Sequence, residues 1–363
     1  MARILLVYQP IDGGVGRHVN DLSLGLARLG HEVVTCGPAP PSAAPGSWTH
    51  VPLELRRAVS LRADIGALRR LGAIVRTVRP DIVHAHSSKA GALARLARIA
   101  HRVPVIYTPH GYAFAGFFER EPERVAYRLA ERLLAPLATR VLCVCEAEAV
   151  LARSVGPADR VHVVYNGVDS DPSCRVDPRM AALHDHGPVI CALTQLRPGK
   201  GMETLIDAIP RLLVDQPEAG IAIWGEGAEL EALRRRAQDL GVGSAVHFLG
   251  ATSDPMSVIR GASLFVLPSW AESFPYVMLE AMSAGIPIVA SDVGGIREAV
   301  GDDAAGLLVA PREPHELALA LTGLLGDTVR CARLGDEARR RVQQRFTVAD
   351  MVQGVARVYR ACD

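Results

Sequence analysis

Short runs of consecutive apolar residues alternate with longer amphipathic stretches along the whole chain. In the first half these runs are ILLVY, HEVVTC, DIVHAH, VPVIYT, RVLCVC and VHVVY, and in the second half VICALT, IAIWG, VHFLG, LFVLP and PIVAS. Continuous apolar runs are typical of strands buried on both faces of a sheet, and the helical segments between them predict crossovers that join parallel strands. The pattern therefore predicts an α/β fold with doubly wound, Rossmann-like parallel sheets.

The rhythm breaks once, in a segment that has three prolines and no periodic pattern between residues 169 and 188. We interpret residues 171–187 as a linker between two Rossmann-like domains, residues 1–170 and 188–345. A length of 363 residues fits two domains of ordinary size. The last helical stretch, in residues 346–363, is expected to cross back to the first domain. In such an arrangement the two sheets would face a common cleft.

Composition excludes several classes of function. Hydrophobic residues make up 49% of the chain and the net charge is +1, so no overall field favours a nucleic-acid partner. The seven cysteines form no CxxC pair, which favours reduced, structural thiols. The first residues lack the features of a signal peptide, and no stretch approaches the ~18 apolar residues that span a bilayer. We expect a cytoplasmic protein.

A glycine-rich loop follows the first predicted strand. Gly13, Gly14 and Gly16 allow a close backbone approach, and a helix expected to begin just after them would direct amides at a phosphate. The dinucleotide fingerprint GxGxxG would need glycine at Val19, and the second strand lacks a terminal acidic residue. A nicotinamide dehydrogenase is therefore disfavoured, and a glycine turn without a ligand remains the alternative.

Polar side chains end two further strands of the first half. They are His84, His86 and Lys89 in DIVHAHSSKAG, and His110 in VIYTPHGY. We expect His84 and His86 to point to opposite faces of their strand, so no metal site is predicted. His110 lies between Pro109 and Gly111, in a loop suited to aiming a side chain into a cleft. A purely structural histidine is the alternative.

The second half begins with a strand followed by RPGKG. Arg197 and Lys200 place two cations at the start of a helix, which is what a diphosphate group requires. The ATP-binding pattern GxxxxGK[ST] is absent. Further on, ESFPYVMLE carries Glu272 in a loop and Glu280 nearly two turns into a helix that would start near residues 274–275. An exposed loop glutamate and a helix-face glutamate are the simpler interpretation of that pair.

The order GGVGRH, TPHGY, NGVD, RPGKG, GEG and ESFPYVMLEAMSAGIPIVASDVGG resembles the retaining nucleotide-sugar glycosyltransferases of family 4, also called group 1, which have the GT-B fold. The resemblance covers essentially the whole chain. It implies that Glu280 holds the nucleotide ribose, Glu272 the donor sugar, and Arg197 and Lys200 the diphosphate. It further implies that Gly14 and Gly16 allow closure over the phosphates and that His110 contacts the sugar, so that the catalytic residues are His110 and Glu272.

The resemblance also implies amides of Phe274, Tyr276 and Val277 near the phosphates. Proline at position 275, where many relatives carry glycine, leaves open which amide makes that contact. Fixed cations and helix dipoles can stabilise a leaving nucleoside diphosphate, so no metal and no other cofactor is expected. Retention in this family would let the departing phosphate accept the proton of a hydroxyl acceptor.

The acceptor is the least defined part. Residues 112–132 combine four aromatic residues with arginines at every fourth position, partly neutralised by glutamates: Tyr112, Phe114, Phe117, Phe118, Arg120, Arg124, Arg128, Arg132, Glu119, Glu121, Glu123 and Glu131. A solvated helix face is one interpretation. The other is a peripheral contact with anionic lipid at the inner face of the plasma membrane, suited to a lipid-linked acceptor. Lys89, Tyr112 and Phe114 are candidate acceptor contacts.

The sequence predicts an enzyme that transfers a hexose from a nucleotide sugar to a hydroxyl acceptor in polysaccharide, glycolipid or other glycoconjugate synthesis. Three alternatives stay open. They are a natural-product glycosyltransferase, a GT-B sugar-nucleotide epimerase or phosphorylase, and a non-catalytic protein that binds sugar nucleotides.

Overall fold

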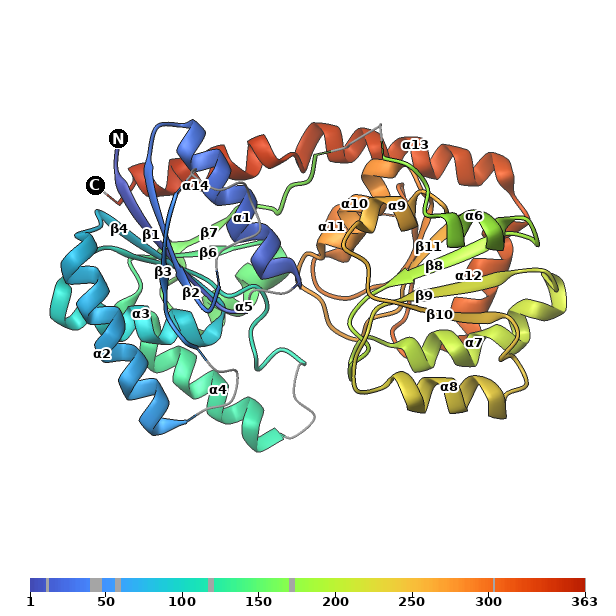
Figure 1. Cartoon of the computed structure of the whole chain (residues 1–363), viewed down its shortest axis with the longest axis horizontal. Helices are drawn as coiled ribbons and strands as arrows, with labels where there is room; N and C mark the ends of the chain where they lie inside the picture. The colour runs from blue at the N-terminus through green and yellow to red at the C-terminus, as the bar shows by residue number, and fades with distance from the viewer. Residues whose placement is uncertain are drawn as a thin grey trace. The chain divides into compact units, whose positions relative to one another are not determined.

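The computed structural model describes residues 1–10, 13–39, 48–55, 60–116, 121–169, 174–302 and 304–362. The chain divides into two compact units (Figure 1). Unit 1 consists of Met1–Asn166 with Val348–Asp363, and unit 2 of Gly167–Thr347. Each unit is an α/β layer structure around one parallel sheet. None of the helices in the described ranges is both long and apolar enough to cross a membrane.

The described part of unit 1 forms a seven-stranded parallel sheet of order β3-β2-β1-β4-β5-β6-β7. Its strands are β1 (Arg3–Tyr8), β2 (Glu32–Gly37), β3 (Thr49–Pro52), β4 (Ile82–His86), β5 (Val105–Thr108), β6 (Arg140–Cys143) and β7 (Val161–Val163). Its helices are α1 (Gly13–Arg28), α2 (Leu61–Val78), α3 (Ser88–His101), α4 (Glu121–Leu134), α5 (Glu146–Val155) and α14 (Val348–Arg360), with short 3-10 turns at Ala135–Leu137 and Ala158–Arg160.

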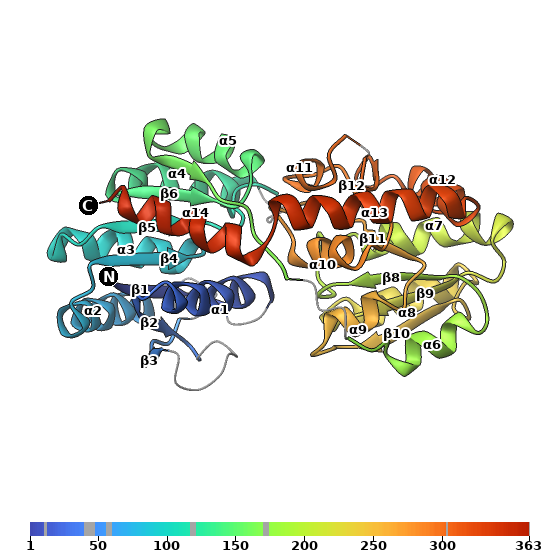
Figure 2. The ribbon, with the colours of Figure 1, turned by 90° about the horizontal axis from the view of Figure 1, so that it is seen from above.

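Strand β1 shows why the apolar runs are continuous. Ile4, Leu6 and Tyr8 point to the face that α1 and α14 cover, where they pack with Val19, Leu22, Leu26, Met351, Val352 and Val355. Leu5 and Val7 point to the opposite face, covered by α2 and α3. Because successive side chains alternate between faces, a strand covered on both faces is apolar at every position. Helix α14 lies against α1 (Figure 2).

The described part of unit 2 forms a six-stranded parallel sheet of order β10-β9-β8-β11-β12-β13. Its strands are β8 (Val189–Leu193), β9 (Gly220–Trp224), β10 (Val246–Gly250), β11 (Leu264–Leu267), β12 (Ile288–Ser291) and β13 (Leu307–Val309). Its helices are α6 (Pro178–His184), α7 (Met202–Asp215), α8 (Leu230–Asp239), α9 (Pro255–Ile259), α10 (Tyr276–Ala284), α11 (Ile296–Val300), α12 (Pro314–Leu325) and α13 (Thr328–Arg345).

The two parallel sheets confirm the predicted fold class, and the eleven apolar runs correspond to eleven of the observed strands. Strands β3 and β13 were not predicted: β3 has four residues that are all exposed or part-exposed, and β13 has only three residues. The stretch predicted as a linker also differs from the expectation. Helix α6 lies within it and packs on unit 2, where Met180 is fully buried and its sulfur accepts a hydrogen bond from the indole of Trp224.

Strand order identifies where each sheet is suited to bind a ligand. In unit 1 the chain turns back at β1, which lies between β2 and β4, and in unit 2 at β8, which lies between β9 and β11. At such switch points the loops beyond the carboxyl ends of the two adjacent strands diverge, and ligands of open α/β sheets bind there. The loops after β1 and β4, and those after β8 and β11, are therefore the expected ligand-binding loops.

Candidate active site

In unit 2 the backbones of three strand-end loops pack against one another. The Trp270 amide after β11 donates to the Gly199 carbonyl after β8 at 2.9 Å, and the Leu196 amide donates to the Glu226 carbonyl after β9 at 2.9 Å. Gly201 has a φ of +68°, and an added Cβ there would overlap the carbonyl oxygen of Pro268. Glycine in RPGKG thus permits the close approach of the β8 and β11 loops.

This packing brings Lys200 and Glu272 together at the switch point. Lys200 Nζ lies 2.6 Å from Glu272 Oε1, and the Ser269 hydroxyl donates to the same oxygen at 2.8 Å. The two charged side chains are only 15% and 10% exposed. Arg197 lies half-buried in the same loop as Lys200. Ser269 was not singled out from the sequence, because a lone serine after a strand carries no signal of its own.

Glu280 lies on α10, four residues after the helix begins at Tyr276, with Pro275 as the N-cap residue. The expectation of nearly two turns was wrong, since four residues are little more than one turn. Glu280 is 5% exposed. Phe274 is buried against Phe346, with ring centroids 5.2 Å apart.

Two helices in this region begin at N-cap residues that supply no side-chain cap. These residues are Gly201 before α7 and Pro275 before α10. Tyr276 is buried and Val277 is half-buried in the first turn of α10. First-turn amides and the positive end of a helix dipole favour an anionic group.

In unit 1 the glycine loop differs from the expectation. Helix α1 begins at Gly13 and not after the three glycines, so Gly14 and Gly16 belong to its first turn. Gly14 is exposed and Gly16 is buried. The helix can include these glycines because a glycine in the first turn lowers helix stability only slightly, since the amides there have no partner within the helix.

Four histidines gather at the carboxyl ends of β4 and β5 and on α1. The rings of His84 and His86 lie 4.1 Å apart on one face of β4. The expectation of opposite faces was wrong, because side chains two residues apart on a strand share a face. His86 Nδ1 lies 3.1 Å from His110 Nε2, and the ring centroid of His110 is 4.7 Å from that of His18. His18, which the sequence did not single out, is held at Nδ1 by Asn166 at 3.0 Å.

These imidazoles are neutral at physiological pH. Burial lowers the pKa of His18 to about 4, although its hydrogen bond to Asn166 acts in the opposite direction. Burial, with the positive charge that neighbouring histidines would carry, holds the pKa of His84, His86 and His110 well below the ordinary value. A neutral imidazole offers one donor and one acceptor, which suits hydrogen bonding to sugar hydroxyls.

The same cluster contains the residues that could hold a metal ion. Among the described residues, His18, His86 and His110 have ligand nitrogens within 4.8 Å of one another. A tetrahedral zinc with bonds of about 2.0–2.1 Å would place its ligand atoms only about 3.4 Å apart. The 3.1 Å separation of His86 Nδ1 and His110 Nε2 is also that of a hydrogen bond, so these two nitrogens are engaged with each other.

The candidate acceptor residues have partners within unit 1. Lys89, on α3, forms an ion pair of 2.9 Å with Asp64 on α2. Tyr112 and Phe114 are buried, with ring centroids 4.9 Å apart, in a hydrophobic cluster with Tyr107 and α5. Burial of both rings gives the predicted acceptor contact no support from the structure.

Helix α4 carries part of the aromatic and arginine stretch. Phe117, Phe118, Glu119 and Arg120 lie outside the described residues. Arg124, Arg128 and Arg132 are exposed. Glu131 does not neutralise them as expected, because it is buried and accepts hydrogen bonds from Arg95 at 2.8 Å and Tyr107 at 3.0 Å. Beside the arginines, Val125, Leu129 and Leu133 are 56%, 56% and 69% exposed.

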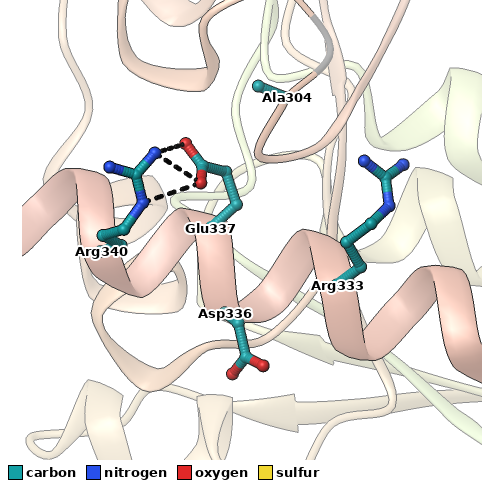
Figure 3. A pocket seen from close by; sticks show the side chains of 5 residues that line it. All are labelled: Ala304, Arg333, Asp336, Glu337 and Arg340. Carbon is teal, nitrogen blue, oxygen red and sulfur yellow. Dashed lines mark hydrogen bonds and ion pairs between the residues drawn. The ribbon is translucent and has the colours of Figure 1, made fainter.

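A separate surface depression of about 700 Å³ lies along α13 in unit 2 (Figure 3). Its lining among the described residues is Ala304, Arg333, Asp336, Glu337 and Arg340. Arg340 is hydrogen-bonded to Glu337 at 2.7 Å. The depression contains no predicted site residue, and its mixed charges favour no ligand class.

Comparison with known proteins agrees with this architecture. The family model described as Glycosyltransferase Family 4 matches residues 12–172, and the model described as Glycosyl transferases group 1 matches residues 177–341. The glycogen synthase of Mycobacterium tuberculosis H37Rv is 30% identical in an alignment that covers 99% of this chain and 94% of that protein. The UDP-Gal:alpha-D-GlcNAc-diphosphoundecaprenol alpha-1,3-galactosyltransferase of Escherichia coli is 26% identical, over 84% of this chain and 81% of that protein.

Among solved structures, Anabaena HepE in complex with UDP and glucose superposes with a TM-score of 0.82 at 23% identity, covering 99% of this chain and 100% of that chain. This likeness extends over both units and identifies the fold as GT-B. Because the two family models together match most of the chain and a relative is 30% identical over 99% of it, the chain belongs to the family 4, group 1 glycosyltransferases and is a glycosyltransferase that uses a nucleotide sugar in glycoconjugate synthesis.

Proposed function

We propose that this enzyme transfers a hexose from a nucleoside-diphosphate sugar to a hydroxyl acceptor with retention of anomeric configuration and without a metal ion. The observation that carries the donor part is the convergence of Lys200 and Glu272 at the switch point of the unit 2 sheet, 2.6 Å apart and largely buried. The Lys200 ammonium therefore lies at the place where a diphosphate would contact the loops after β8 and β11.

We assign the nucleotide to unit 2. Lys200 and Arg197 would neutralise the diphosphate, and the first turns of α7 and α10 would add backbone amides. Glu280, one turn along α10, would accept hydrogen bonds from the ribose hydroxyls. Glu272 would turn from Lys200 to the hydroxyls of the donor sugar. These roles follow the family resemblance, and the burial of both carboxylates favours specific polar partners for them.

The chemical step needs little from the protein besides positioning and charge. The acceptor oxygen attacks the anomeric carbon, the bond from that carbon to the phosphate oxygen breaks, and the acceptor proton passes to the departing phosphate. Lys200, Arg197 and the helix amino termini stabilise the negative charge that develops on the leaving group. His110 would hydrogen-bond the reacting sugar as a neutral imidazole, a state favoured by its lowered pKa.

We propose a lipid-linked acceptor and a peripheral membrane contact through α4. Exposed apolar residues at positions 125, 129 and 133 run beside exposed arginines at 124, 128 and 132, which is the composition of an interfacial helix. The E. coli relative is named for an acceptor linked to diphosphoundecaprenol. A soluble acceptor is the alternative that the vesicle experiment below distinguishes.

The donor assignment is tested by a thermal-shift panel of UDP-, GDP- and TDP-sugars with excess chelator, followed by product analysis with and without acceptor. UDP-glucose is the first probe, because the HepE structure holds UDP and glucose. We expect one nucleotide to stabilise the wild type, with Lys200→Ala and Glu280→Ala each losing that effect. Stabilisation that survives both substitutions would remove the nucleotide from this site, and a product formed without acceptor would indicate an epimerase.

The membrane contact is tested by co-sedimentation with vesicles. We expect weak, salt-sensitive binding to phosphatidylglycerol vesicles and none to phosphatidylcholine vesicles, since each arginine near an anionic surface contributes about 1 kcal/mol. Arg124→Glu with Arg128→Glu should abolish binding and leave nucleotide affinity unchanged. If the wild type ignores anionic vesicles at low salt, α4 is a solvated face and the acceptor is soluble.

A further inference from the structure

His110 has an uncommon backbone conformation that something must hold in place. Its φ is +54°, and Gly111 follows with a φ of +105°. Residues other than glycine rarely adopt the left-handed region, and they do so mainly where surrounding contacts fix them. The loop leads directly from β5, so its conformation decides where the His110 imidazole points.

A side chain of α5 contacts this loop. Glu148 is 2% exposed, and its Oε1 accepts the amide hydrogen of Gly111. Its Oε2 accepts the amide hydrogen of Val144 at 2.9 Å, just before the helix begins. One oxygen of the Glu148 carboxylate thus accepts an amide at the start of its own helix, and the other accepts an amide from a loop 37 residues away in the sequence.

An N-terminal cap alone does not explain this arrangement. Glu148 is the third residue of α5, and Cys145 is the N-cap residue, with its sulfur accepting from the Glu148 amide. In a capping box the third-residue glutamate serves its own helix end. Here Glu148 also holds the amide of Gly111, the residue that follows His110, while the His110 imidazole contacts His86 at 3.1 Å. The backbone turn and the imidazole that it presents therefore each have a partner.

We infer that Glu148 is a positioning residue for His110, which orients the imidazole through the Gly111 amide. The inference rests on the proposed function only in taking His110 as the residue that contacts the donor sugar.

Two variants separate the positioning role from helix capping. Glu148→Asp keeps the charge and can still cap α5, yet is one methylene too short to hold both amides. Glu148→Gln keeps the length but presents an amide NH₂ to one of two N–H donors. Glu146→Gln, which removes an exposed charge on the same helix paired with Arg153 at 3.4 Å, is the matched control.

The experiment measures steady-state kinetics and the histidine ring resonances of the full-length protein, with His110 assigned from His110→Asn. We expect Glu148→Asp and Glu148→Gln to lower kcat at least tenfold and to shift the His110 resonance. The KM for the nucleotide sugar should stay within about threefold, and Glu146→Gln should behave as wild type. Wild-type kcat with an unshifted His110 resonance in a folded Glu148→Asp protein would overturn the inference.

Failure of the proposed function gives a different result. If the wild type transfers no sugar from any nucleotide tested, the resonances alone decide whether Glu148 orients His110. If Glu148→Gln does not fold, Glu148→Asp supplies both measurements, because it retains the bond to its own helix. An unshifted His110 resonance then refutes the positioning role whatever the activity.

Discussion

Replacing Glu272 with glutamine should improve binding of a bare nucleoside diphosphate and at the same time impair turnover. In the structure the Lys200 ammonium is engaged by Glu272 Oε1 at 2.6 Å. A diphosphate that recruits Lys200 must compete with this carboxylate and then leaves it without its cation. Glu272→Gln removes both costs, while it also removes the carboxylate proposed to hold the donor sugar.

The size of the effect follows from the burial of the pair. Exposed ion pairs contribute about 0–1 kcal/mol, whereas hydrogen bonds to charged groups contribute about 1.5–3 kcal/mol. With side chains 15% and 10% exposed, the pair lies between these limits. We expect a gain of about 1–2 kcal/mol, which is roughly a 5- to 30-fold tighter Kd.

Calorimetry with the nucleoside diphosphate that stabilises the wild type most strongly measures this gain. Ser269→Ala is the local control, because it removes the other hydrogen bond to Glu272 Oε1 and leaves the charge in place. Repeating Glu272→Gln in a Lys200→Met background completes a double-mutant cycle. If the gain acts through Lys200, it should disappear in that background.

Two results would refute this reasoning. Equal or weaker diphosphate binding by Glu272→Gln would mean that Lys200 does not have to leave Glu272. A gain that persists in the Lys200→Met background would mean that Glu272 repels the phosphates directly and that the ion pair is incidental.

Three further predictions concern metal ions, the RPGKG loop and pH. Excess chelator should change nucleotide affinity less than twofold, and a loss above tenfold by calorimetry would contradict metal-independent binding. Gly201→Ala should lower the melting temperature of unit 2 more than Gly199→Ala, because both have positive φ but only Gly201 would overlap Pro268, and equal shifts would exclude the overlap as the cause. Acid should destabilise unit 1: His18 has its pKa lowered from 6.5 to about 4, so the unfolded state binds more protons below pH 6.5 and stability falls as pH drops from there towards 4. His18 alone accounts for about 2 kcal/mol between pH 7 and 5, and hydrogen exchange in α1 that is no faster at pH 5, after correction for intrinsic rates, would contradict this.

The repeated strands and the parallel architecture could be predicted from the sequence, because strands buried on both faces appear as continuous apolar runs. Positions 4–8 of β1 are apolar for that reason, and so is every position of β8. Strand β3 has no such pattern, since its residues THVP are exposed or part-exposed, and the apolar run of β13 is only three residues long. Gly201 and Lys200 were also readable, because a strand, a glycine turn and a helix start follow one another directly in the chain.

The partners of the site residues were decided by strand order and by the crossover connections. Lys200 and Glu272 are 72 residues apart, and they meet because β8 and β11 are neighbours in the sheet. Glu148 reaches Gly111 across 37 residues, and His18 reaches Asn166 across 148. Some errors were of a local kind: the starts of α1 and α10 were misplaced by a few residues, and the strand period of two would have placed His84 and His86 on one face. A local pattern reports how each segment is buried, but which polar groups meet depends on how separate segments are ordered in the sheet, and only the tertiary structure fixes that order.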